Sequence, residues 1–252
     1  HWGIAGAAYA TIFAQYVSGI GILLYVLFRC RSLFPERKDL CFDGGILKEI
    51  AGLSSLTCLQ QSVMNFGILM VQGLVNSFGA TTMAAFAAAV KIDTFAYLPV
   101  QDFGNAYSTF VAQNYGAGNK ERIRRGTKES FAISTAFSLV ISALVFAFAA
   151  PLMQIFVSSA ETAVIASGVR YLRIEGAFYF GIGCLFLLYG YYRAIKRAEM
   201  SVVLTVISLG IRVLLAYVLS ATFLGETGIW MAIPIGWILA DLTGLLYMRK
   251  TW

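Results

Sequence analysis

Four long stretches without any Asp, Glu, Lys or Arg constrain this sequence more than any other feature. They cover residues 2–28, 50–90, 131–160 and 176–192. A helix needs roughly 20 mainly apolar residues to cross about 30 Å of hydrocarbon, and the second stretch is long enough for two crossings. Because unpaired amides are too costly in lipid and these runs do not alternate in polarity, we predict membrane helices and exclude a β-barrel.

The composition supports a membrane location. The chain is 59% hydrophobic and only 13% charged, whereas soluble domains are about 25% charged. In a soluble protein the net charge of +6 would suggest a nucleic-acid partner. Here the basic residues fall between the apolar runs, so the membrane explains them and we predict no nucleic-acid partner.

We predict an all-α, polytopic membrane protein with seven transmembrane helices. The expected spans are residues 4–28, 50–77, 81–112, 131–157, 167–192, 201–223 and 228–248. Fifteen of the nineteen Lys and Arg residues lie in alternate connections, at residues 29–49, 114–130, 193–200 and 249–252. By the positive-inside rule these connections are cytoplasmic, which places the C-terminus inside a plasma or inner membrane.

The longest connection, residues 29–49, mixes charges with apolar residues such as Leu33, Phe34 and Phe42. This pattern is typical of an interfacial segment, and we interpret it as a cytoplasmic linker between two helical bundles. The predicted domains are therefore residues 1–28, the linker 29–49, and a bundle over residues 50–252. The chain opens on His1 rather than Met, so we expect a piece that lacks its natural N-terminus.

The second span carries a polar stripe. At 100° per residue its polar side chains share one face of the helix; they are Ser54, Gln61, Asn65, Gln72 and Asn76. Such a stripe avoids lipid. It either forms hydrogen bonds between helices or lines a water-filled cavity, and the sequence leaves both readings open.

The third span adds charges to the same kind of pattern. Lys91, Asp102 and Asn105 share a face, and Pro99 is expected to kink the helix. Lys91 lies near the middle of the membrane and needs a carboxylate, which Asp93 or Asp102 could supply. The pair could exchange a proton or be a static ion pair. We predict that Gln61, Asn65, Gln72, Lys91, Asp102 and Asn105 line a substrate cavity.

Two further charges lie inside later spans. Arg212 is near mid-membrane in the sixth span and Asp241 lies in the seventh. Since neighbouring helices joined by a tight hairpin pack together, we expect these residues to form an ion pair. Asp93, Arg212 and Asp241 are thus candidates for ion coupling or for structural ion pairs.

No motif indicates catalysis or a bound cofactor. The four cysteines have no CxxC spacing and the only histidine is terminal, so we predict no metal or haem site. P-loop, GxSxG and HExxH patterns do not occur in the sequence, and we predict that the chain is not an enzyme.

Two segments carry a family resemblance. PVQDFGNAYSTFVAQNYGAGNKERIRRG, residues 99–126, resembles the end of the eighth helix and the following loop of multidrug and toxic compound extrusion (MATE) transporters. GYYRAIKRAEMSVVLTVISLGIRVLLAYVL, residues 190–219, is similar to the family's later GxxRGxG loop and the next helix with its inward arginine. Ala194 and Lys196 replace the expected glycines, while Gly116 and Gly118 suit a left-handed turn that ends a helix.

The resemblance implies helices six to twelve of a twelve-helix antiporter. Such a protein exports drugs or other small organic compounds in exchange for Na⁺ or H⁺, by alternating access between two six-helix bundles. The implied partners are small organic substrates, membrane lipids and an N-terminal six-helix bundle. No cofactor is implied beyond the coupling ion.

One branch of the family carries a cation-binding Glu and Asp at positions that correspond to Ser62 and about Ile182. The resemblance therefore implies that ion coupling resides mainly in the N-terminal half. Two alternatives are a lipid-linked oligosaccharide flippase of the same superfamily and a seven-helix receptor. A flippase would show a more cationic cavity than Lys91 and Arg212 provide, and the final span has no Lys for a retinal Schiff base.

Overall fold

The computed structural model describes residues 3–30 and 41–251 and contains helices but no strand in those ranges. Two compact units divide the chain, His1–Glu49 and Ile50–Trp252. The first contains α1 (Gly3–Arg29) and the start of α2. The middle of the expected linker, residues 31–40, lies outside the described residues.

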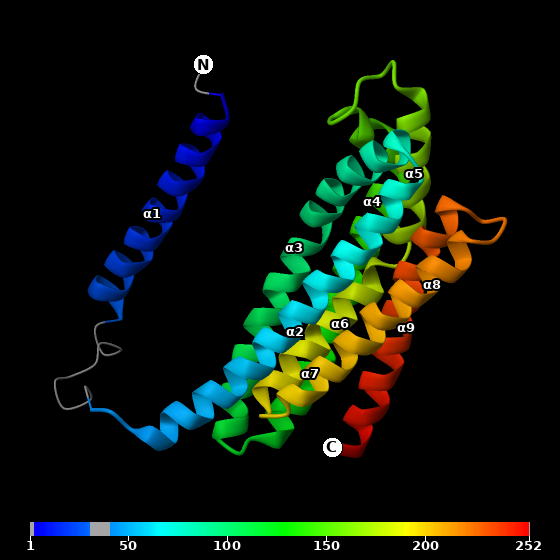
Figure 1. Cartoon of the computed structure of the whole chain (residues 1–252). Coiled ribbons are helices and arrows are strands. Elements are labelled where there is room, and N and C mark those ends of the chain that lie inside the picture. Colours follow the sequence, from blue (N-terminus) through cyan, green and yellow to red (C-terminus); the bar gives the residue numbers. More distant parts are fainter. Residues whose placement is uncertain (1–2, 31–40, 252) are drawn as a thin grey trace. The chain divides into compact units, whose positions relative to one another are not determined.

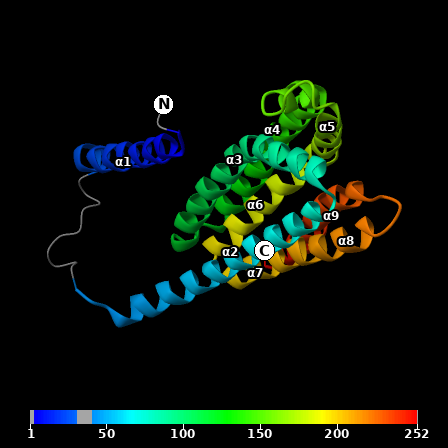
Figure 2. The same ribbon diagram turned by 45° about the horizontal axis from the view of Figure 1, so that its top comes forward.

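The second unit is a helical bundle (Figure 1). Its elements are α2 (Gly44–Ser77), α3 (Ala80–Gly116), α4 (Lys120–Gln154), α5 (Thr162–Gly176), α6 (Tyr179–Ala194), α7 (Ala198–Thr205), the π-helical segment η3 (Val206–Gly210), α8 (Ile211–Ser220) and α9 (Glu226–Thr251). Figure 2 shows the same bundle tilted toward the viewer.

The predicted spans are confirmed as helices. Six helical segments among the described residues are long and apolar enough to cross a membrane, and α5 with α6 can form a seventh. That pair is bent by 52° at a short break. The segment α7–η3–α8 runs as one span, with the π-helix in its middle. π-Helical turns interrupt α-helices most often at functional sites.

The effects expected from Pro99 and Gly116 differ from those observed. The backbone stays helical through Pro99, and the non-helical residue is Phe148 in α4, three residues before Pro151. A proline ring collides with the carbonyl of the preceding turn, which accounts for a kink at Phe148. Gly118 has the left-handed φ of 70°, whereas Gly116 is the last helical residue of α3.

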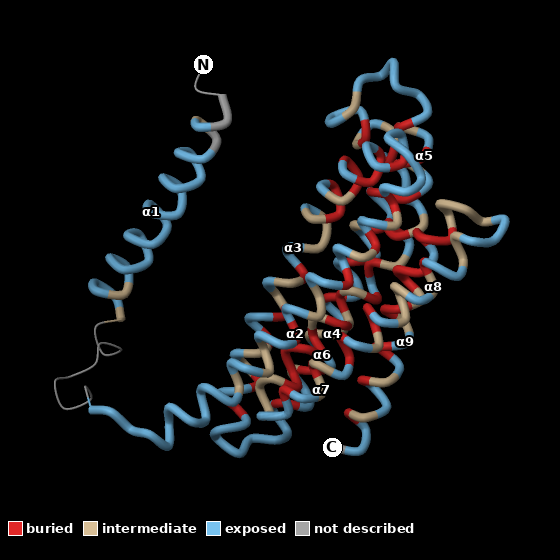
Figure 3. Tube along the Cα trace, viewed as in Figure 1, coloured by how far each residue is buried: buried red, intermediate tan, exposed pale blue. Residues whose placement is uncertain are grey.

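Close glycine contacts join α3 to α6. A Cβ at Gly190 would lie 2.7 Å from the backbone oxygen of Gly104, so no larger residue fits without moving one helix. Small residues let helix backbones approach in this way inside membranes. The buried residues in Figure 3 run along the inside of the bundle.

An aromatic cluster ties three helices together. Phe86 of α3 stacks on Trp230 of α9, with ring centroids 5.5 Å apart. Tyr171 of α5 meets both rings edge-on, at 5.6 and 4.9 Å. Edge-to-face and stacked ring pairs stabilise packing beyond the area they bury. The cluster fixes the position of the α5 segment that carries Glu175, one turn after Tyr171.

Candidate functional site: a buried carboxylate pair

A cavity of about 230 Å³ lies inside the second unit, and we call it the acidic cavity. Its polar lining residues are Gln72, Asp93, Tyr97, Gln101, Tyr171, Glu175, Tyr189, Ser208 and Arg212. They come from α2, α3, α5, α6, η3 and α8. The cavity thus draws on most of the bundle's helices.

Two carboxyl groups meet at this cavity. Asp93 is 2% exposed and Glu175 is 6% exposed. Each carboxyl group lies close enough to interact electrostatically with the other and with the Tyr171 side chain. The Tyr179 hydroxyl donates a hydrogen bond to Asp93 Oδ1. Asp93 Oδ2 and Glu175 Oε2 are buried and have no hydrogen-bond partner in the described part of the chain.

Arg212 is the one basic residue among the described residues that line the acidic cavity. It lies within electrostatic range of both carboxyl groups. Arg212 is the second residue after the π-helix η3, where Gly236 of α9 leaves room for close packing. One guanidinium can neutralise one carboxylate, so with both carboxyls ionised one negative charge remains uncompensated.

The uncompensated charge defines what the site can bind. Two carboxylates in contact cannot both stay ionised away from water without a counter-charge. A proton or a single monovalent cation would supply it. The described residues contain no group of three or more His, Cys, Asp or Glu able to hold a metal ion.

Glu175 reaches the interior because the fifth span is broken. α5 ends at Gly176 and α6 begins at Tyr179, so Glu175 lies in the last turn before the bend. Broken helices inside membranes often form ion and substrate sites. Sequence reasoning did not identify Glu175, Tyr171 and Tyr179 as site residues. The spacing of Tyr171 and Glu175, one helical turn apart, and the Gly176 that follows were the signals that could have found them.

The residues predicted to line a substrate cavity separate in the structure. Gln72 lines the acidic cavity. Gln61 and Asn65 of α2 are exposed, as are Asp102 and Asn105 of α3. Asn105 Oδ1 accepts a hydrogen bond from Arg193 at 3.4 Å.

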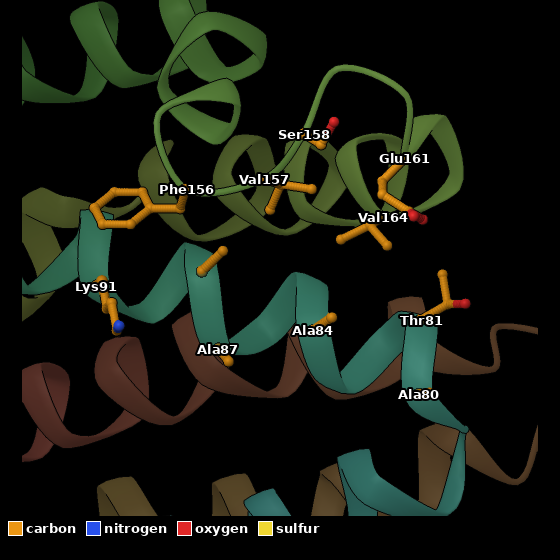
Figure 4. Close-up of a pocket in the computed structure, with 11 residues that line it drawn as sticks. Ala80, Thr81, Ala84, Ala87, Lys91, Phe156, Val157, Ser158, Glu161 and Val164 are labelled. Atoms are coloured by element: carbon orange, nitrogen blue, oxygen red, sulfur yellow. The ribbon is translucent and has the colours of Figure 1, made fainter. Parts of the chain in front are cut away.

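Lys91 lies in a different hollow, which we call the alanine groove. The groove has a volume of about 580 Å³ and runs between α3 and the α4–α5 connection, with Ala80, Ala84 and Ala87 along one wall (Figure 4). The Lys91 ammonium lies 5.9 Å from the centre of the Phe156 ring, a cation–π distance.

Neither carboxylate expected to pair with Lys91 forms an ion pair with it among the described residues. Two helical positions separate Lys91 from Asp93, which places them about 200° apart around α3. Asp93 therefore points into the bundle, while Lys91 stays on the outer face.

The expected pair between Arg212 and Asp241 is not what the structure shows. Asp241 interacts with Cys184 and lies against Gly181 of α6. Arg212 instead packs beside Gly236. Gly236 and Asp241 are five residues apart, which corresponds to about 140° around the helix and 7.5 Å along it. Asp241 thus lies on another face of α9, out of reach of Arg212.

Comparison with known proteins decides the family. The sequence profile of the MatE family matches residues 56–218, more than half of the chain. The chain belongs to the MatE family. This confirms the resemblance in the two loop motifs, and it assigns the chain to a family of multi-pass membrane transporters rather than enzymes.

Curated relatives extend this result. The chain is 30% identical over 250 residues to a probable multidrug resistance protein, YpnP, from Bacillus subtilis; the match covers 98% of this chain and 55% of that protein. It is 28% identical to a probable multidrug resistance protein, NorM, from Thermotoga maritima, over 97% of this chain and 53% of that protein. The chain therefore spans about half the length of the curated relatives that it matches.

A solved structure supports the fold. A crystal structure of a MATE protein in complex with MaL6 superposes with a TM-score of 0.90 at 24% identity, over 99% of this chain and 57% of that one. At this identity the match establishes shared architecture. The all-α, polytopic prediction is confirmed.

Proposed function

We propose that the protein is a cation-coupled antiporter that exports drugs or other small organic compounds by alternating access. The coupling ion is Na⁺ or H⁺, and this chain supplies one half of the transporter. The Asp93–Glu175 pair carries the proposal, since in the described part of this chain of membrane helices the two buried carboxylates share a single cavity-lining arginine. Buried charges inside membranes are costly and usually mark ion pathways.

The coupling would follow from differential affinity. A cation or proton that neutralises the acidic cavity lowers the cost of keeping both carboxylates buried. The substrate would bind more tightly to one conformation of the transporter and the ion to the other. Each ligand then shifts the equilibrium between the two conformations toward the one it binds better, so the two ligands exchange. The family resemblance led to the expectation that coupling resides mainly in the other half of the protein. The proposal adds a second site, in this half.

The exposed polar side chains would face the substrate. Gln61, Asn65, Asp102 and Asn105 lie on exposed faces of α2 and α3, while Lys91 lines the alanine groove. In this proposal they form one wall of a central cavity. An N-terminal six-helix bundle, the expected partner, would form the other wall, which agrees with relatives about twice the length of this chain. The C-terminus would be cytoplasmic, as the loop charges predict.

Transport by the whole protein in proteoliposomes tests the coupling site. Ethidium efflux would be followed under an imposed Na⁺ or pH gradient. Glu175→Gln and Asp93→Asn remove a carboxylate each and are expected to reduce gradient-driven efflux about tenfold or more, the effect of losing about 1.4 kcal/mol of coupling.

Glu199→Gln is the matched control, because it removes an exposed carboxylate that lines neither the acidic cavity nor the alanine groove. It is expected to retain the dependence on the gradient. Full gradient-driven efflux in the Glu175→Gln variant would rule out the coupling site. Unchanged export and cation dependence in Gln61→Ala, Asn65→Ala and Asp102→Asn together would rule out the assigned substrate wall.

A further inference from the structure

A second cavity, which we call the basic pocket, opens at one end of the bundle. It has a volume of about 510 Å³ and is lined by Tyr115, Lys120, Glu121, Ile123, Arg124, Tyr191, Ile195, Arg197 and Lys250. At this end α3 turns into α4, α6 gives way to α7, and α9 finishes (Figure 1). The pocket is separate from the acidic cavity and shares no lining residue with it.

The pocket has an excess of positive charge. Four basic residues line it, and Glu121 is the single acidic lining residue. Arg197 donates a hydrogen bond to the Tyr247 hydroxyl at 3.2 Å, which leaves its charge uncompensated. In the part of the chain that the structure describes, none of the four forms a salt bridge with a carboxylate.

The dipole of α4 adds to this field. Lys120 and Glu121 begin α4, whose N-cap Asn119 accepts a hydrogen bond from the Arg122 amide at 3.1 Å. The Lys120 amide donates to the Gly118 carbonyl at 3.1 Å and the Ile123 amide donates to the Asn119 carbonyl at 3.2 Å. This end of α4 therefore contributes mainly through the helix dipole, which is positive here. The four basic side chains therefore surround a site suited to a phosphate group.

An apolar strip leads away from the pocket along α9. Leu246, Leu242 and Leu239 precede Lys250 by 4, 8 and 11 residues, so all four share one face of the helix. The leucines are 61%, 53% and 37% exposed. Since α9 is a candidate membrane span, this face is available to lipid. Tyr115 at the rim is also exposed, as is common for tyrosine at the membrane boundary.

We propose that the basic pocket binds the phosphate headgroup of an anionic phospholipid, with an acyl chain along Leu246, Leu242 and Leu239. The charge of the pocket selects an anion, and the apolar strip selects a lipid over a free phosphate. Basic pockets between membrane helices bind anionic headgroups in this way. The site is independent of the proposed transport activity.

Native mass spectrometry of the purified whole protein tests the site, with phosphatidylglycerol as the probe and phosphatidylcholine as the neutral comparison. The pocket variant Arg124→Gln/Lys250→Gln removes two of the four positive charges. Each basic residue near an anionic headgroup contributes about 1 kcal/mol of binding free energy. Removing two of them is therefore expected to weaken the affinity about 30-fold. We expect that loss for phosphatidylglycerol and little change for phosphatidylcholine.

The matched control is Lys128→Gln/Arg249→Gln. It removes one Arg and one Lys from the same two helices, α4 and α9, at positions that do not line the pocket. We expect it to bind phosphatidylglycerol within about twofold of the unchanged protein. Equal losses in the two variants would show a general charge effect and overturn the proposal.

A third arm separates lipid from free anion. Pyrophosphate is titrated against the protein–phosphatidylglycerol complex, and Leu246→Ser/Leu242→Ser interrupts the apolar strip. The proposal requires the leucine variant to weaken phosphatidylglycerol binding without changing that of pyrophosphate. Tight pyrophosphate binding with no preference for phosphatidylglycerol over phosphatidylcholine would contradict a lipid site.

Discussion

Lys91 and Asp93 lie two residues apart on α3 and experience opposite surroundings. Asp93 is 2% exposed and meets Tyr179, Glu175 and the field of Arg212. Lys91 is exposed, lines the alanine groove and lies over the Phe156 ring. One turn of helix thus carries a buried anion on one face and an exposed cation on the other.

The difference shows that charge alone does not mark a coupling site within a membrane helix. A buried carboxylate must be neutralised by its surroundings, so its neighbours are specialised and its loss is costly. A lysine in an open groove keeps access to solvent, headgroups or substrate, and its surroundings need little adjustment.

Replacing Arg212 by Met is expected to destabilise the protein by about 3–5 kcal/mol, because it leaves two buried carboxylates without their arginine. Lys91→Met also removes one positive charge, but from the exposed face of α3. It should lower the free energy of unfolding by no more than about 0.5 kcal/mol. Unfolding of the whole protein in detergent micelles, by titration with SDS, measures both. Similar losses in the two variants would show that the two faces of α3 are equivalent.

Gly190→Ala tests the packing behind the buried face of α3. Its new methyl group would lie 2.7 Å from the backbone oxygen of Gly104, which no change of rotamer can relieve. We expect a loss of up to about 3 kcal/mol in the same assay. Gly116→Ala, at the exposed end of α3 with no atom within 4 Å of a Cβ, should be neutral or slightly stabilising. A tolerated Gly190→Ala would contradict the close approach of α3 and α6.

Tyr179→Phe removes the hydroxyl that donates to Asp93 and leaves the aromatic ring in place. Hydrogen bonds to charged groups contribute about 1.5–3 kcal/mol, so we expect a loss of about 2 kcal/mol. The matched control is Tyr97→Phe, because Tyr97 of α3 lines the acidic cavity and its ring packs near Phe186. If Tyr97→Phe destabilised the protein as much as Tyr179→Phe, the hydrogen bond to Asp93 would not explain the loss of stability.

The smallest effect is expected at Asp102, on the exposed face. Asp102→Asn should change the stability by less than about 0.5 kcal/mol, since an exposed carboxylate needs no buried partner. The same SDS titration checks it. A loss as large as that of Arg212→Met would mean that Asp102 has an essential partner within the protein.

The membrane helices could be predicted from local sequence pattern alone. Uncharged runs such as residues 131–160 can satisfy their amides in lipid only as helices, so length and apolarity predicted the spans. The helix angle alone also separates Asp93 from Lys91, because a 200° rotation over two residues is a property of the α-helix itself. Two loop motifs were sufficient to indicate the family, which the comparisons confirmed.

The candidate site followed from sequence only in part. Asp93 and Arg212 were recognised as costly charges, and Gln72 as part of a polar stripe. Their partners were not, since Glu175 was not among the candidate residues and Arg212 was expected to pair with Asp241. The bend between α5 and α6 brings Glu175 inward, and the face of α9 that meets η3 holds Gly236 instead of Asp241. The bend leaves a local signal in Gly176, which directly follows Glu175, whereas the face of α9 that meets η3 is set by packing between distant segments.

Apolar helices with charges at set angles around them follow from the order of residues, because those properties depend on neighbours along the chain. Which charges meet depends instead on how the helices pack. Asp93 and Glu175 are 82 positions apart, and their contact depends on a broken helix, a π-helical turn and glycine contacts between helices. The free-energy cost of burying each carboxylate depends on these neighbours, which are distant in sequence, and they therefore determine what the pair can bind.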